Sequence, residues 1–146
     1  MTLPILLKGI LNPEDAALAL RYGIDGIIVS NHGGRQVDGA VAALDALPKI
    51  VEEVDGKVPI LMDSGIRGGA DILKALALGA SSVLIGRPFV YGLAVAGEAG
   101  VERVISQLIA DIDLNLALSG RRTISEVNRS FLVEDTIFKQ SMERTT

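Results

Sequence analysis

The only histidine of the chain, His32, stands in a polar segment that directly follows an apolar run. The run Gly26–Val29 is rich in β-branched residues, and the seven residues after it, 30–36, read SNHGGRQ. This pattern predicts a buried strand that ends in a loop, the place where α/β proteins keep their chemistry. An imidazole suits proton transfer near neutral pH, and Arg35 could hold a carboxylate with two hydrogen bonds. The alternative is a surface turn with solvated side chains, but the density of polar groups favours a site.

A second polar segment, 64–69 with the sequence SGIRGG, precedes a predicted helix that starts near Ala70. Its glycines and the helix N-terminus would place free backbone N–H groups beside Arg67, an arrangement that suits a phosphate group. Gly86 and Arg87 repeat the combination after the next predicted strand. Glycines also form plain turns, so one such loop is weak support. Two on consecutive strands favour phosphate binding.

Two further charged residues are expected on the same rim. Asp63 would repel a phosphate, but its carboxylate could accept hydrogen bonds from sugar-like hydroxyls. Lys8 ends the first predicted strand. It could be an ordinary exposed lysine, yet its position beside the other loops favours contact with a ligand.

Composition restricts the class of protein. The chain has 146 residues, 49% of them hydrophobic and 22% charged, which is enough for one domain with a core. It contains no cysteine, which excludes a disulfide framework and a cysteine-ligated metal, and it favours the cytosol. The net charge of −4 argues against a general nucleic-acid surface. No apolar stretch approaches the roughly 20 residues of a membrane span, and no signal peptide is recognisable. We expect no nucleic-acid or membrane partner and no metal.

Strand and helix patterns alternate four times along the chain. The predicted strands are Pro4–Leu7, Ile27–Ser30, Val58–Met62 and Ser82–Ile85. The predicted helices open at Asn12–Pro13, run from about Val41 to Val54, continue from the glycine-rich segment to Leu78, and extend from Val101 to Leu118, with a short helix near Ser125. Pro48 is expected to kink or break the second helix. A polar tail begins at about residue 134, and one domain is expected over residues 1–146.

Four parallel βα units are about half of a TIM (β/α)8 barrel. The first strand begins almost at Met1, and an open piece of four strands would leave unpaired edges. The sequence therefore predicts a fragment of a barrel, or a half-barrel that closes by pairing with another chain, either a second copy or a complementing half. The alternative is a small open α/β sheet of flavodoxin type.

Several motifs together resemble one enzyme family over nearly the whole chain. They are LPILLKG at 3–9, SNHGGRQ at 30–36, DSGIR at 63–67, KALALGA at 74–80 and IGRP at 85–88. In order and spacing they are similar to the C-terminal half of the FMN-dependent 2-hydroxy acid dehydrogenases and oxidases, which include glycolate oxidase, lactate oxidase, lactate 2-monooxygenase and flavocytochrome b2. Asp-Ser-Gly at 63–65, in place of Asp-Gly-Gly, leans toward the lactate monooxygenase branch.

The resemblance implies a cytoplasmic oxidoreductase that uses FMN to oxidise a small 2-hydroxy acid. His32 would be the catalytic base and would contact the substrate, and Arg35 would bind the substrate carboxylate. Lys8 would lie near flavin N1 and O2, where negative charge develops on reduction, and Ser30 would also contact the flavin. The remaining residues implied in FMN binding are Asp63 for the ribityl hydroxyls, and Ser64, Gly65, Ile66, Arg67, Gly86 and Arg87 for the phosphate.

The resemblance also implies parts that this chain does not carry. In the family, the flavin-stacking segment, the substrate-binding tyrosines and the aspartate that orients the base lie on the N-terminal half of the barrel. The alternative is therefore a catalytically incomplete half-barrel that only binds FMN or self-associates. Nucleotide dehydrogenases acting on inosine monophosphate share the phosphate loops but need a cysteine nucleophile, which is absent. Type 2 isopentenyl-diphosphate isomerase also binds FMN, but we associate no His-Gly-Gly-Arg segment with it.

Overall fold

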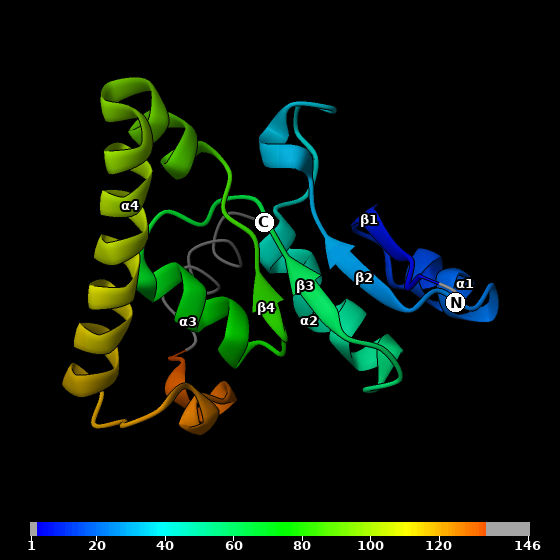
Figure 1. Cartoon of the computed structure of the whole chain (residues 1–146). Helices are drawn as coiled ribbons and strands as arrows, with labels where there is room; N and C mark the ends of the chain where they lie inside the picture. Colours follow the sequence, from blue (N-terminus) through cyan, green and yellow to red (C-terminus); the bar gives the residue numbers. More distant parts are fainter. Residues whose placement is uncertain (1–2, 134–146) are drawn as a thin grey trace, which may run out of the picture.

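A single parallel sheet organises residues 3–133, which are the residues that the computed structural model describes. The four strands lie in the order β1-β2-β3-β4 (Figure 1). They are β1 Leu6–Ile10, β2 Gly26–Val29, β3 Ile60–Met62 and β4 Ser82–Val83. The helices are α1 Pro13–Arg21, α2 Ala43–Val54, α3 Gly69–Ala77 and α4 Arg87–Leu118, with short 3-10 turns η1 His32–Gly34, η2 Ile124–Glu126 and η3 Arg129–Phe131.

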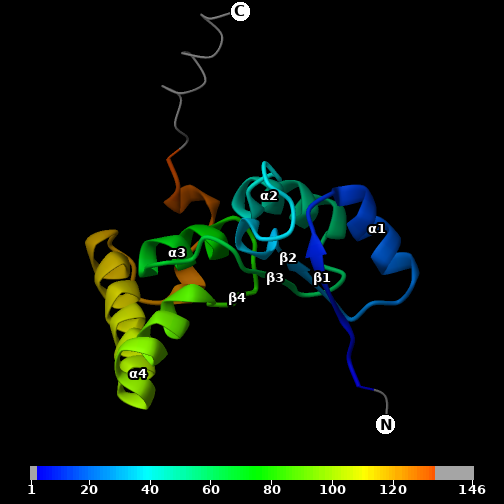
Figure 2. The same cartoon turned by 90° about the horizontal axis from the view of Figure 1, so that it is seen from above.

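The order of the strands decides between the two predicted folds. In a flavodoxin-type sheet the strands lie in the order 2-1-3-4-5, because the second strand is added on one side of the first and the later strands on the other side. Such a sheet carries helices on both faces. Here the order in the sheet equals the order in the chain, and α1, α2 and α3 lie along one face of the sheet (Figure 2). These are successive βα units of a barrel wall. The prediction of parallel βα units that form half of a TIM barrel is confirmed, and the flavodoxin-type alternative is wrong.

The two faces of the sheet differ in burial. Ile27 and Ile60 are paired in register and point toward the helices, and they are 0% and 4% exposed. The next row of the sheet, on the opposite face, joins Lys8, Ile28 and Leu61. Lys8 is exposed, and the two apolar side chains are only partly buried. The opposite face therefore carries apolar side chains that the described residues do not cover, as expected of the inner face of an open barrel wall.

Helix α1 begins where the sequence predicts it to begin. The Asn12 side chain accepts a hydrogen bond from the Glu14 N–H at 3.0 Å, and Pro13 is the first helical residue. Helix α2 does not break at Pro48, since it runs unbroken from Ala43 to Val54, while a kink at this proline stays a prediction. Leu47 beside the proline is fully buried, so packing against the sheet offsets the hydrogen bond that Pro48 cannot make.

Helix α4 begins at Arg87, fourteen residues before the predicted start at Val101, which corrects the prediction. Its helical geometry is interrupted at Ala96 and Gly97, and Gly97 has φ +58°. The chain reverses at this break, so α4 consists of two segments, 87–95 and 98–118, that lie against each other (Figure 1). The apolar, glycine-containing stretch between the two segments carries no polar turn signal. The sequence pattern therefore does not mark the hairpin, and the first segment was not predicted.

The predicted strands are recovered with small shifts at their ends. The first strand is two residues later than predicted, at Leu6–Ile10, and the last is shorter, at Ser82–Val83. The short helix predicted near Ser125 is the turn η2. The polar tail from about residue 134 lies outside the described residues, and one domain over residues 1–146 stays a prediction.

Candidate functional site

Three polar side chains meet on the uncovered face at the carboxyl ends of β1, β2 and β3. Lys8 Nζ donates a hydrogen bond to Ser30 Oγ at 2.6 Å and forms an ion pair with the Asp63 carboxylate. Ser30 and Asp63 each stand two residues beyond the half-buried Ile28 and Leu61, so all three side chains share one face. The sequence prediction that Lys8 lies on the same rim as the polar loops is confirmed by these contacts.

The surroundings of Asp63 keep its carboxylate charged. Burial alone would raise the pKa of this carboxyl group, because it removes water from the charged form. The hydrogen bonds of Lys8, Ser30 and Ser64 and the positive charge of Lys8 outweigh burial, so the pKa of Asp63 lies below its ordinary value of 3.8. Asp63 therefore faces Lys8 as a carboxylate at neutral pH.

Ser64 links this pair to the histidine loop. Its hydroxyl donates to Asp63 Oδ1 at 2.8 Å and accepts a hydrogen bond from the Gly33 N–H at 3.0 Å. Ser64 has φ +76°, a left-handed conformation that costs a non-glycine residue roughly 1 kcal/mol. The two hydrogen bonds offset this cost, so a serine occupies a position whose backbone geometry favours glycine.

The histidine loop after β2 is a run of three left-handed residues. His32, Gly33 and Gly34 have φ values of +55°, +68° and +74°. The Asn31 side chain accepts a hydrogen bond from the Gly34 N–H at 3.2 Å, and Ser30 Oγ accepts one from the His32 N–H at 3.0 Å. The backbone of the loop is thus fixed by its own side chains, and the glycines supply conformations that other residues rarely adopt.

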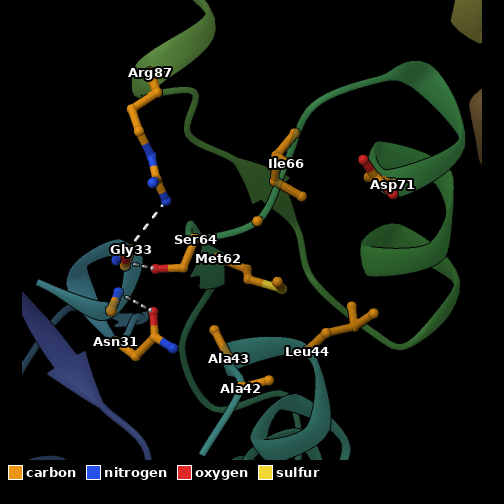
Figure 3. Close-up of a pocket in the computed structure, with 12 residues that line it drawn as sticks. Asn31, Gly33, Ala42, Ala43, Leu44, Met62, Ser64, Ile66, Asp71 and Arg87 are labelled. Carbon is orange, nitrogen blue, oxygen red and sulfur yellow. Dashed lines mark hydrogen bonds between the residues drawn. The ribbon is translucent and has the colours of Figure 1, made fainter. Parts of the chain in front are cut away.

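A cavity of about 310 Å³ lies between the loops that follow β2, β3 and β4 (Figure 3). Arg87, from the first turn of α4, extends along one side of the cavity toward Gly33, and its Nη2 donates to the Gly33 carbonyl at 3.2 Å. Met62 and Leu44 contribute apolar walls. The complete lining is Asn31, Gly33, Gly34, Ala42, Ala43, Leu44, Met62, Ser64, Gly65, Ile66, Asp71 and Arg87.

The N-terminus of α3 departs from the prediction of free N–H groups. The Asp71 carboxylate accepts hydrogen bonds from the N–H groups of Arg67 and Gly68, at 3.0 and 3.2 Å. The N–H of Gly69 donates to the Asp111 carboxylate, which comes from α4. Carboxylates therefore accept three of the N–H groups that the sequence predicts to be free, and a phosphate site at this point stays a prediction. Asp71 three residues after Gly68 is a capping-box spacing that the sequence shows; Asp111 has no such local signal.

The predicted site residues fall into three groups. The cavity brings together Ser64, Gly65, Ile66 and Arg87, and Gly86 immediately precedes the helix that carries Arg87. The ion-pair cluster brings together Lys8, Ser30 and Asp63. The side chains of His32, Arg35 and Arg67 are exposed and do not line the cavity.

Two negative findings hold for the described residues. No helix within residues 3–133 is long and apolar enough to cross a membrane. In the same part of the chain, no group of three or more His, Cys, Asp or Glu side chains is placed to hold a metal ion.

Fold and site together define the class of protein. It is a parallel βα half-barrel whose ligand cavity, lined by glycine loops and an arginine, lies at the carboxyl ends of the strands. Residues 1–134 match the FMN-dependent dehydrogenase family, and the chain belongs to that family, whose cofactor is FMN.

Individual relatives agree with this assignment. The chain is 57% identical over 133 residues to an L-lactate oxidase of Lysinibacillus sphaericus, covering 91% of this chain and 34% of that protein. It is 50% identical over 130 residues to 2-hydroxyacid oxidase 2 of Homo sapiens, covering 89% and 37%. A crystal structure of mandelate oxidase aligns with a TM-score of 0.84 at 47% identity, covering 88% of this chain and 38% of that one. The chain thus spans about a third of the length of the curated relatives it matches.

Proposed function

We propose that this chain is the half of an FMN-dependent 2-hydroxy acid oxidoreductase that holds the FMN phosphate and carries the catalytic base. The observation that supports it most is the cavity at the carboxyl ends of the strands, whose lining includes Arg87 and Ser64, with Ser64 bonded to Asp63 of the Lys8–Asp63 pair. Lactate, glycolate and mandelate are the substrate class, as small acids with a hydroxyl group beside the carboxylate.

The donor set of the cavity suits a phosphate. Arg87 stands at the N-terminus of α4, where the first N–H groups of a helix have no partner within the helix. Its guanidinium could form two charge-assisted hydrogen bonds to a phosphate. A Cβ built on Gly33 would lie 3.1 Å from Arg87 Nη2, so glycine at this position leaves the guanidinium its room. With the N-terminus of α3 occupied by Asp71 and Asp111, the segment 64–66 and the start of α4 remain as the phosphate donors.

Lys8 and its partners suit the polar edge of a flavin. When bound, FMN accepts two electrons from the substrate, and negative charge develops at its N1 and O2 positions. A lysine already held on Ser30 and Asp63 would stabilise that charge without reorganisation. The Asp63 oxygens retain further acceptor positions for ribityl hydroxyl groups.

His32 and Arg35 would act on the substrate from the loop beside the cavity. Exposed on the strand-end side of the sheet, the imidazole is free to accept the proton that leaves the substrate, and the Arg35 fork is free to bind the carboxylate. A base without an acidic partner is less well oriented. We therefore propose that the remainder of a barrel, or a second copy of the chain, completes the site, and we keep the cytosol as the proposed compartment.

Titration of FMN and of riboflavin, which lacks the phosphate, tests the phosphate site directly. We expect the chain to bind FMN at least roughly tenfold more tightly than riboflavin, because several charge-assisted hydrogen bonds depend on the phosphate. Flavin fluorescence gives both dissociation constants. Equal affinity for the two flavins would contradict the proposed phosphate site.

The second candidate function is flavin binding or self-association without catalysis. The uncovered apolar face of the sheet and the two free edge strands, β1 and β4, favour it. Anaerobic mixing of the FMN-loaded chain with lactate separates the two. Bleaching of the flavin absorbance shows catalysis by this chain, and an unchanged spectrum with bound FMN shows a binding half alone.

A further inference from the structure

Asp111, on the second segment of α4, reaches the first turn of α3. Its carboxylate accepts the N–H of Gly69, and its other oxygen accepts a hydrogen bond from Asn115 Nδ2 at 2.9 Å. Asn115 also donates to the Asp111 carbonyl at 2.7 Å. The Asp111 side chain is thus held by its own helix and directed at one backbone donor of a neighbouring helix.

The contact between the two helices is as close as backbones allow. A Cβ built on Gly69 would lie 2.5 Å from the Ile112 N and 2.6 Å from the Asp111 carbonyl carbon, both backbone atoms of α4. Such distances do not occur, so only glycine permits this approach. The position of the second segment of α4 is therefore fixed against the start of α3.

The same helix carries Arg87 on its first segment. The two segments are locked together where Gly92 and Gly100 meet, because a Cβ built on Gly92 would lie 2.6 Å from the Gly100 carbonyl oxygen, and one on Gly100 would overlap Gly92. The place of Arg87 in the cavity lining consequently depends on where Asp111 holds the second segment.

The connection closes on the other side of the cavity. Gly69 continues directly from the loop 64–68, whose first residues line the cavity. Ser64 of that loop is bonded to Gly33, and Gly33 is bonded to Arg87. The loop 64–68, α3, Asp111, α4, Arg87 and Gly33 thus form a closed series of contacts that includes residues of the cavity lining.

We propose that Asp111 is a positioning residue that sets the spacing between the loop 64–66 and Arg87, and so the grip on the flavin phosphate. The inference rests on the proposed FMN site. Asp111 does not line the cavity, so its part is mechanical. If Asp111 acted only through its charge, its removal would strengthen phosphate binding, because a nearby negative charge repels the phosphate. Loss of a positioning contact would weaken phosphate binding instead.

Three variants test the inference through the preference for FMN over riboflavin. Asp111→Ala removes the acceptor, Asp111→Asn keeps an acceptor oxygen of the same shape, and Asp113→Ala makes a similar change at an exposed residue of the same helix. In Asp111→Ala we expect the preference to fall roughly tenfold, the effect of about one lost charge-assisted hydrogen bond, with riboflavin affinity unchanged. Asp111→Asn should restore most of the preference, and Asp113→Ala should keep it whole.

The outcomes are separable. If the preference for FMN is unchanged or increased in Asp111→Ala, Asp111 is not a positioning residue. An equal loss of affinity for FMN and riboflavin shows general destabilisation and also contradicts the inference. If the unaltered chain shows no preference for FMN, the proposed function fails instead. Nuclear magnetic resonance of the flavin-free chain then still decides on Asp111: the Asp111→Ala change should shift the Gly33 amide and Arg87 Nε signals, and the Asp113→Ala change should not. If the Gly33 and Arg87 signals do not shift in Asp111→Ala, the inferred link from Asp111 to Arg87 and Gly33 is wrong.

Discussion

Arg87 Nη2 and the carbonyl oxygen of Gly33 are joined by a hydrogen bond of 3.2 Å between two residues of the cavity lining (Figure 3). The two residues are 54 positions apart in the sequence: Arg87 begins α4, which follows β4, and Gly33 lies in the turn η1, which follows β2. The guanidinium is therefore already directed across the cavity by the protein itself. A phosphate entering between these loops would meet a cation in place, which lowers the cost of ordering that side chain on binding.

The first prediction compares Arg87 with Arg67, since the sequence predicts that both bind the FMN phosphate. Arg87→Ala should weaken FMN binding by at least roughly tenfold, because a charge-assisted hydrogen bond is lost at the cavity. Arg67→Ala should have a smaller effect, since its side chain is exposed and lies outside the cavity lining. Flavin fluorescence titration measures both. Equal losses in the two variants would contradict the assignment of the phosphate to the start of α4.

The second prediction concerns the pH dependence of stability. The pKa of Asp63 is below 3.8 in the folded chain, so its charged form stabilises the fold above that pH. This contribution is lost as the pH falls through the lowered pKa. Asp63→Asn should therefore reduce the free energy of unfolding most at pH 5 to 7, and the difference from the unaltered chain should shrink on acidification below about pH 4.

Urea unfolding at a series of pH values provides the measurement. Asp38→Asn serves as the control, because Asp38 is an exposed loop carboxylate that makes no ion pair within residues 3–133. A pH-independent loss in Asp63→Asn would show that shape and not charge matters at this position.

The third prediction addresses assembly. Strands β1 and β4 are the edges of the sheet, and the residues leading into β1 are apolar and exposed, with Ile5 at 62% exposure. Such edges pair with other chains, and a lysine placed there opposes pairing. We expect dimers or larger species in sedimentation velocity at micromolar concentration, and fewer of them in Ile5→Lys than in the control Leu18→Lys on α1. A compact monomer without the substitution would contradict the open-edge interpretation.

The fourth prediction concerns catalysis in a barrel completed with the N-terminal part of the L-lactate oxidase relative. His32→Gln should abolish flavin reduction by lactate while FMN stays bound, because the base acts in the chemical step. Arg35→Lys should chiefly raise KM, since a point charge replaces a two-pronged clamp. Anaerobic mixing followed at the flavin absorbance band tests both. Rapid reduction in the His32→Gln protein would exclude His32 as the base.

The sequence predicted the architecture well because its signals are local. Apolar runs ending in polar loops marked the strands, and Asn12–Pro13 marked the start of α1. Long-range contacts were beyond this reasoning. Nothing near Asp111 indicates that its carboxylate binds Gly69, 42 residues away, and nothing around Pro48 shows the packing that keeps α2 continuous.

For the site, the sequence predicted the residues better than their arrangement. The strand-end rule correctly placed Lys8 beside Ser30 and Asp63, because parallel strands bring their carboxyl ends to one edge. It could not separate Arg87, which lines the cavity, from Arg67, which does not, since both follow a strand and adjoin glycines. The direction of a side chain depends on the backbone angles of its loop, and these are set by partners elsewhere in the chain.

The order of the strands also has a consequence for how the chain acquires its structure. Each strand pairs with the next one along the sequence, so pairing can proceed by closing one loop at a time, which gives a lower contact order than a sheet whose neighbouring strands are distant in the sequence. Lys8 and Asp63 are different, because they lie 55 residues apart on strands that are not neighbours. Their ion pair can form only once β2 has docked between them. Lys8, which we propose to contact the ligand, therefore reaches its final position only after β1, β2 and β3 have paired in register.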